Sequence, residues 1–233
     1  MKSSVSSVIA ASGDRSVTSL LLTKIRSIFV IFASGVRSAT LLLLALSYAA
    51  VGYFQYLFFY WIHYYFETIR HFGKDQSRWY ATIPILTMAV CMASGGWVSD
   101  RMQRRYGRSL GRKIVPMGGM VLSAALLGVG LMCEAPTAMV FWFALSMGAV
   151  GACESAFWLT AVELGGRRGG TAAAILNTGG NGIGLLAPIF TPAISAAIGW
   201  KWGIAMGGLV CIFGGVCWWF IRLDEGRVEL LNR

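Results

Sequence analysis

The sequence predicts an all-α, polytopic membrane protein whose six transmembrane helices form one bundle. Hydrophobic residues make up 56% of its 233 positions and charged residues only 13%, whereas soluble domains carry about 25% charged residues. Five long stretches are nearly free of charge and exceed the roughly 18–20 residues that cross a bilayer. The sequence lacks the alternating segments of about 10 residues that are typical of a membrane β-barrel.

Apolar runs bounded by charged or turn-forming residues define the six helices. They are predicted over residues 38–66, 79–98, 114–133, 138–162, 171–198 and 202–221. The bundle therefore occupies residues 37–224, between an N-terminal segment (1–36) and a C-terminal tail (225–233).

The first helix carries two neighbouring polar stripes at helical spacing. One stripe contains Tyr48, Gly52, Gln55 and Phe59, and the other Tyr53, Tyr56, Tyr60 and His63. Two polar stripes on one spanning helix indicate a cavity wall. We expect Gln55 and Tyr56 to contact a substrate there, while some of the tyrosines serve only to pack or to anchor the helix at the interface.

The segment between the second and third helices contains Gly96-x-x-x-Asp100-Arg101, followed by Gly111-Arg112-Lys113. A glycine near a helix end permits a close approach of a neighbouring helix, and an aspartate can cap a facing helix N-terminus. With the arginines as ion-pair partners, this cluster is predicted to form a gate at the mouth of the bundle. The alternative is a basic loop that only sets orientation.

The fourth helix contains a carboxylate well inside its apolar run, in GACESAFWLTAVEL (151–164). A carboxylate at membrane depth is a functional candidate by default, so Glu154 is predicted to be protonatable. A structural hydrogen-bond partner is the alternative. Trp158 lies one turn further on the same face, and Glu163, near the helix end, is expected in a gate or surface ion pair.

The fifth helix contains NTGGNGIGLLAPIFTP (177–192), with four glycines and two asparagines. No strand pattern precedes the glycines, so a dinucleotide-binding loop lacks its context. On a helix, Asn177, Asn181, Gly184 and Pro188 share one face, and the prolines can kink it. An asparagine in hydrocarbon needs a partner, which is either a substrate in a cavity or a neighbouring helix.

The formal net charge of +10 has a topological explanation. Most basic residues fall in the N-terminal segment, the two loops after the second and fourth helices, and the C-terminal tail. The opposite loops hold only Arg70, Lys74, Arg78 and Lys201. Basic residues near helix ends stay cytoplasmic, so both termini are expected in the cytoplasm of an integral membrane protein, with a bacterial inner membrane as the expected location. Nucleic acid is not an expected partner.

Residues 1–36 differ from the bundle because they combine Ser-rich and basic sequence with a short apolar run. A helix that lies in the membrane interface is expected, and a cleaved transit peptide is the weaker alternative. The five cysteines lie in or at the ends of apolar runs without CxxC spacing, and the two histidines are isolated. No metal, cofactor or enzymatic activity is therefore expected.

The cytoplasmic-loop motif from Gly96 to Lys113 resembles the signature of the major facilitator superfamily. YLFFYW (56–61) and AILNTGGN (174–181) with the following Ala187-Pro188-Ile189 are similar to the seventh and eleventh helices of its anion:cation symporter branch. The resemblance implies the C-terminal six-helix half of a proton-coupled carrier of small organic anions, such as sugar acids. Gln55, Tyr56, Trp158, Asn177 and, with less support, Asn181 would then line its cavity, and Gly96, Asp100, Arg101, Gly111 and Arg112 its gate.

A carrier of this kind needs two six-helix bundles, so the resemblance also implies a missing N-terminal half or a second chain as partner, besides the bilayer and the anion. A truncated gene product is the expected explanation. The alternative function is a half-transporter that does not transport by itself but pairs with or regulates another membrane protein.

Overall fold

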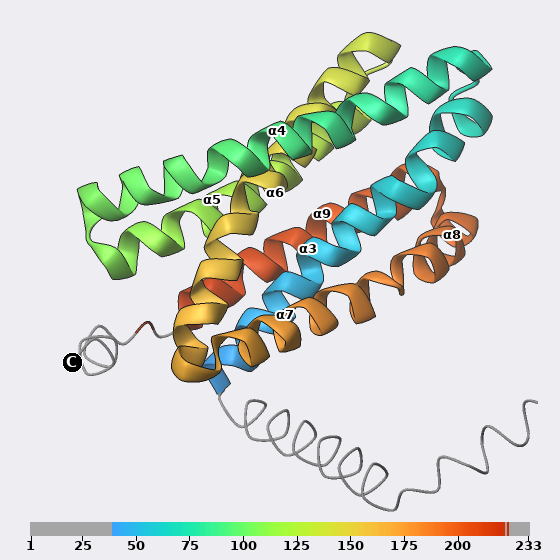
Figure 1. The fold of residues 1–233 in the computed structure, drawn as a ribbon. Coiled ribbons are helices and arrows are strands. Elements are labelled where there is room, and N and C mark those ends of the chain that lie inside the picture. Colours follow the sequence, from blue (N-terminus) through green and yellow to red (C-terminus); the bar gives the residue numbers. More distant parts are fainter. Residues whose placement is uncertain (1–38, 222, 224–233) are drawn as a thin grey trace, which may run out of the picture.

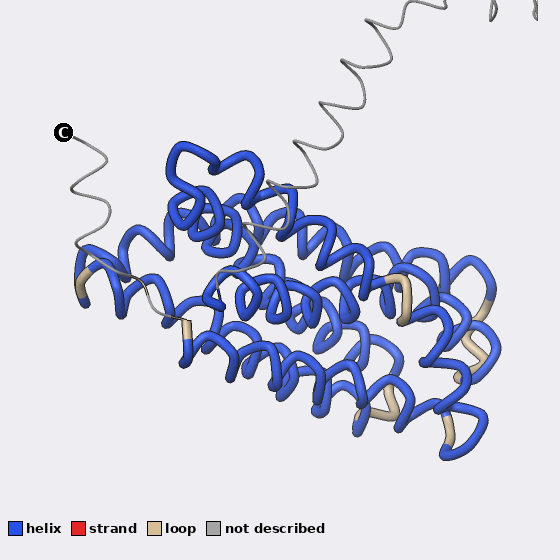
Figure 2. The backbone as a smooth tube through the Cα atoms, turned by 90° about the horizontal axis from the view of Figure 1, so that it is seen from below, coloured by secondary structure: helices blue, strands red, loops and turns tan. Residues whose placement is uncertain are grey.

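The computed structural model describes residues 39–221 and 223. Its helices are α3 (Ala39–Tyr64), continued by a π-helical turn (Tyr65–Ile69), then α4 (Lys74–Tyr106), α5 (Arg108–Met132), α6 (Pro136–Gly165), α7 (Gly169–Gly184), α8 (Ala187–Ile198) and α9 (Trp200–Phe220). No described residue lies in a strand, and short loops join the helices (Figure 2). The predictions for residues 1–36 and 225–233 lie outside the described residues.

Five of the described helical segments are long and apolar enough to cross a membrane. One of these, Pro136–Ile198, has 63 residues, which at about 1.5 Å per residue is roughly three times the bilayer's hydrocarbon thickness. It reverses direction at the 3₁₀ turn Gly166–Arg168 between α6 and α7. The chain therefore runs six times along the bundle, which confirms the predicted all-α polytopic fold.

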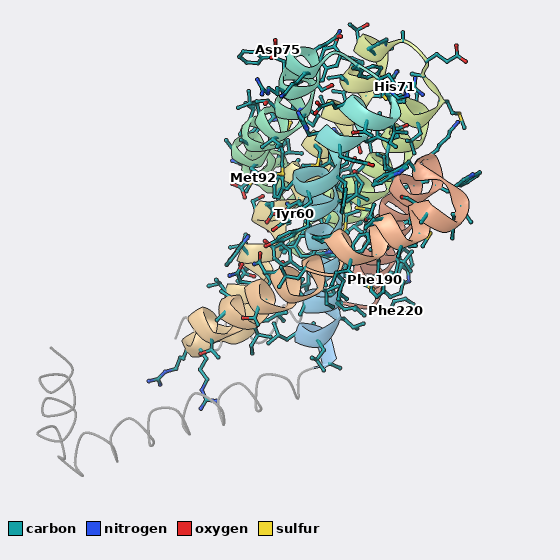
Figure 3. The ribbon with its side chains drawn as sticks, turned by 90° about the vertical axis from the view of Figure 1, so that its right-hand side faces the viewer. Tyr60, His71, Asp75, Met92, Phe190 and Phe220 are labelled. Carbon is teal, nitrogen blue, oxygen red and sulfur yellow. The ribbon has the colours of Figure 1, made fainter. Side chains whose placement is uncertain are left out.

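The bundle has two distinct ends (Figure 1). The start of α3, the α4–α5 turn, the α6–α7 turn and the end of α9 lie at one end. The loops α3–α4, α5–α6 and α8–α9 lie at the other. Figure 3 shows His71 and Asp75 close together at this second end, away from Phe220 at the end of α9. The arginines of the α4–α5 and α6–α7 turns thus lie at the same end of the bundle, which agrees with the prediction that they lie on the same side of the membrane.

Helix α3 is the most enclosed of the spans, with 72% of its most apolar window buried. It packs against α7, α8 and α9, while α6 packs against α4 and α5 on the other side of the bundle. Leu44, Phe54, Leu57 and Phe58 of α3 are fully buried, whereas Phe59 and Tyr60 are exposed. Most of α3 therefore lies in the core, and between residues 47 and 60 its uncovered face is limited to the half-buried Gln55 and Tyr56 and the exposed Phe59 and Tyr60.

The fifth predicted helix is two helices. Leu185 and Leu186 form a turn between α7 and α8, so Pro188 lies in the first turn of α8 and no longer on one helical face with Asn177 and Asn181. A proline has no N–H to donate to residue i−4 and clashes with its carbonyl, which explains a break before Pro188. The predicted kink is confirmed in this stronger form, whereas Pro192 lies inside α8 without interrupting it.

Candidate functional site

Glu154 of α6 lies at the centre of a hydrogen-bond network that joins α6 to α3. The side chain is only 4% exposed. Tyr48 donates its hydroxyl to Oε2 at 2.9 Å, and Gln55 donates Nε2 to Oε1 at 2.6 Å. Trp158, one turn along α6, donates Nε1 to Oε2 at 3.2 Å. Buried charges need such partners, so three donors from two helices hold this carboxylate in place.

A second network joins α3 to α7. Tyr56 donates its hydroxyl to Oδ1 of Asn181 at 2.9 Å. Asn181 in turn donates Nδ2 to the Asn177 side-chain oxygen at 2.8 Å and to its carbonyl at 2.9 Å. Both asparagines are exposed. Asn181 thus links two helices, which is the interhelical role considered for these residues, while Nδ2 of Asn177 donates no hydrogen bond within the described part of the chain.

Close glycine contacts set the distance between α3 and α7. A Cβ at Gly52 would collide with the carbonyl group of Gly180. A Cβ at Gly180 would collide with the Tyr48 ring, and one at Gly184 with the Tyr56 ring. Small residues allow helices in membranes to approach closely. The glycines of α7 therefore bring its asparagines within reach of Tyr56, as their packing role predicts.

The two networks meet on neighbouring positions of α3. Gln55 and Tyr56 are half-buried, and they turn to α6 and α7 respectively through the bonds described above. Trp158 is exposed beside the first network, and Asn177 beside the second. The structure thus brings all the predicted cavity residues to one face of α3 and its flanks. Amide and indole N–H groups on this face can donate hydrogen bonds to a carboxylate or hydroxyl.

An ion-pair cluster lies at the basic end of the bundle. Arg112 of α5 is 3% exposed and donates both terminal nitrogens to the two Glu163 oxygens of α6, one bond being 3.0 Å long. It also donates to Oε1 of Gln103 on α4 at 2.9 Å, and Arg108 donates to Glu163 at 3.0 Å. A Cβ at Gly111 would collide with the backbone of Gln103. Three helices are therefore tied together at Arg112.

The other predicted gate residues are not part of this cluster. Asp100 is exposed, and Arg101 lies over the Trp97 ring at 6.0 Å. The close approach to α6 is made by Gly95, where a Cβ would meet the Ala152 Cα at 2.7 Å, whereas Gly96 has only an ordinary 3.9 Å contact with Ser155. Asp100 and Arg101 therefore face outward, and their predicted part in a gate stays a prediction.

Sequence reasoning missed two residues that the structure places in these clusters. Tyr48 belonged to a polar stripe, but its contacts depend on how α3 packs against α6. Its ring lies 6.1 Å from the Trp158 ring, and its hydroxyl donates to Glu154. Gln103 carried no signal of its own. Tyr48 lies two helical turns before Gln55 on the same polar stripe, and this spacing was the signal that could have found it. No group of metal-ligating side chains occurs among residues 39–221.

Comparison with known proteins places these observations in a family context. The family model described as the Major Facilitator Superfamily matches residues 44–232. The chain is 27% identical to a probable chloroplastic anion transporter 3 of rice (Oryza sativa subsp. japonica) over 180 residues, which are 76% of this chain and 34% of the rice protein. It is 24% identical to a probable sulfoacetate transporter of Cupriavidus necator over 139 residues, 59% of this chain and 32% of that protein. A chloroplastic ascorbate transporter of Arabidopsis thaliana is 29% identical over 140 residues, 59% of this chain and 25% of the plant protein. The chain thus spans about a third or less of these relatives.

Proposed function

Because the chain belongs to the Major Facilitator Superfamily, we propose that it is the C-terminal-type half of a transporter of small organic anions. It is an integral membrane protein, and its six-helix bundle works with a second six-helix bundle by alternating access. Sugar acids are the expected substrates, and a proton gradient drives the cycle without a cofactor. The basic end of the bundle faces the cytoplasm, most simply that of a bacterium.

One observation carries this proposal: hydrogen-bond donors from α3, α6 and α7 converge on one uncovered face. A small organic anion offers carboxylate and hydroxyl groups, which can accept a hydrogen bond from Nδ2 of Asn177. Gln55, Tyr56 and Trp158, whose donors are bound to Glu154 and Asn181 in this structure, complete the same face. The named functions of the relatives, which include anion, sulfoacetate and ascorbate transport, fit an anion better than a neutral ligand. Transport requires a midplane site between two bundles, so the uncovered face is where the second bundle closes over the substrate.

Binding to the chain itself tests this function. We expect labelled gluconate, an aldonate, to bind saturably to the chain in lipid nanodiscs. Asn177→Ala should weaken binding about fivefold, because a typical net hydrogen bond contributes about 1 kcal/mol. Gln76→Ala removes an amide at the far end of α4, where Gln76 pairs with Tyr80, and should leave binding unchanged.

Equal affinities of the Asn177→Ala and original chains would remove Asn177 from the site. If gluconate, sulfoacetate and ascorbate all fail to bind, the anion-carrier proposal is wrong. A matching uptake measurement uses proteoliposomes that contain the chain together with a second six-helix bundle, since transport is expected only from the pair.

A further inference from the structure

Two donors that the proposed function assigns to the anion are already bound to Glu154. Gln55 and Trp158 are expected to bind an anion, yet both already donate to the carboxylate of Glu154. None of the salt bridges among the described residues includes Glu154. A substrate anion next to the Glu154 carboxylate would be repelled by its like charge. This repulsion is strong because the site is partly buried.

We propose that Glu154 takes up a proton when the anion binds, and that rotation of the Gln55 amide couples the two events. This inference rests on the proposed anion-carrier function. In the state described here, Gln55 donates Nε2 to Oε1 of Glu154, and both oxygens of the carboxyl group accept hydrogen bonds. When a proton from water adds to Oε1 of Glu154, that oxygen becomes a donor. Gln55 then turns its amide over, accepts from the acid with its own Oε1, and presents Nε2 to the anion.

Among the three partners of Glu154, Gln55 is the one best placed to change from donating a hydrogen bond to Glu154 to accepting one from it. The Trp158 indole can only donate, so it serves the carboxylate but cannot accept from the acid's proton. The Tyr48 hydroxyl can accept, but Tyr48 is buried and its ring packs against Phe157 at 5.2 Å. Gln55 is half-buried on the uncovered face of α3. Only its amide therefore connects the acid with a ligand on that face.

Few other groups near Glu154 can titrate within the part of the chain that the structure describes. Tyr48 faces it from α3, and Cys153 adjoins it on α6, with Cys211 of α9 interacting with that thiol. Helix α7 has no ionisable side chain. The residues that α4 and α5 place against this turn of α6 include glycines, namely Gly95 and Gly96 from α4 and Gly119 from α5. A proton taken up in this part of the bundle on anion binding is thus assigned to Glu154.

The test uses infrared spectra and binding isotherms of the complete chain in nanodiscs, with gluconate, sulfoacetate and ascorbate as probes. In the absence of a probe, the carbonyl band of a protonated acid should grow as pH falls. The part of this band that comes from Glu154 is the difference between the original chain and Glu154→Gln. It should be kept in Glu134→Gln, an exposed control acid, and shifted in Gln55→Leu, which removes the acceptor.

Addition of a probe at a pH where Glu154 is ionised should make the same band grow in the original chain but not in Gln55→Leu. The apparent affinity should weaken by up to about tenfold per pH unit above the transition, as one coupled proton requires. In Glu154→Gln it should become nearly independent of pH.

The outcomes separate the two proposals. Saturable probe binding without growth of the band, or with the same pH dependence in Glu154→Gln, would overturn the coupling and leave the anion carrier intact. Failure of all three probes to bind would overturn the carrier function and the anion-linked step with it. An unshifted band in Gln55→Leu would overturn the role of Gln55 whether or not a probe binds.

Discussion

Replacement of Gly52 by valine is expected to separate α7 from α3 and to prevent the chain from accumulating in a folded form. A Cβ at Gly52 would collide with the Gly180 carbonyl oxygen and meet its carbon at 2.9 Å. The obstacle is backbone, which cannot rotate away like a side chain. Overpacking usually costs about 1–3 kcal/mol, and here the cost should reach or exceed the upper end. The predicted result is loss of the monodisperse peak when detergent-extracted chain is analysed by size-exclusion chromatography.

The control for this experiment lies on α7 itself. A Cβ at Gly182 would meet no atom of residues 39–221 within 4 Å, so Gly182→Val changes the same residue type in the same way without the collision. It should keep the monodisperse peak and lower thermal stability only slightly. If the two variants behave alike, the close contact between Gly52 and Gly180 does not determine how these helices pack.

Removal of the Glu163 side chain is expected to give the second large effect. Glu163→Ala leaves the buried Arg112 guanidinium with Gln103 as its remaining partner in this cluster, and Arg112 Nε already lacks a hydrogen-bond partner among the described residues. Breaking a buried ion pair by deleting one partner costs about 3–5 kcal/mol. Because Glu163 itself is 22% exposed, we expect about 3 kcal/mol. The measurement is chemical or thermal unfolding in detergent, followed by circular dichroism.

Arg108 provides the matched comparison. It binds the same carboxylate, but its side chain is 51% exposed, and exposed ion pairs typically contribute less than about 1 kcal/mol. Arg108→Ala should therefore destabilise the bundle far less than Glu163→Ala. Equal losses for both variants would show that burial of Arg112 is not what makes this cluster important.

Much of the fold could be predicted from the sequence, because each span had to be apolar over its full length. The helix ends were harder. The second helix extends to Lys74–Tyr106 instead of 79–98, since polar residues beyond the bilayer can continue a helix without an apolar signal. The break at Leu185 was also hidden, because glycine and proline indicate a kink without fixing whether the helix merely bends or ends.

The sequence singled out the residues of the candidate site but not their pairings, and their role in binding stays a prediction. The polar stripe on α3 and the acid in α6 drew attention to Gln55, Tyr56 and Glu154, because a polar group inside an apolar span is costly and is therefore a functional candidate. That Gln55 binds Glu154 while Tyr56 binds Asn181 depends on the rotation of α3 between its neighbours. Likewise, Gly95 and Gly96 are adjacent in sequence, and only helix geometry decides which one contacts α6.

The interruption between α7 and α8 also constrains how the bundle sits in lipid. Since Pro188 has no N–H, the carbonyl oxygen of Gly184 cannot receive the usual helical hydrogen bond from four residues onward. An oxygen without a donor is not tolerated among acyl chains, although it is tolerated where water or other protein covers it. Gly184 is buried beside the Tyr56 ring of α3, so this stretch of main chain is covered by a neighbouring helix and is turned away from the hydrocarbon.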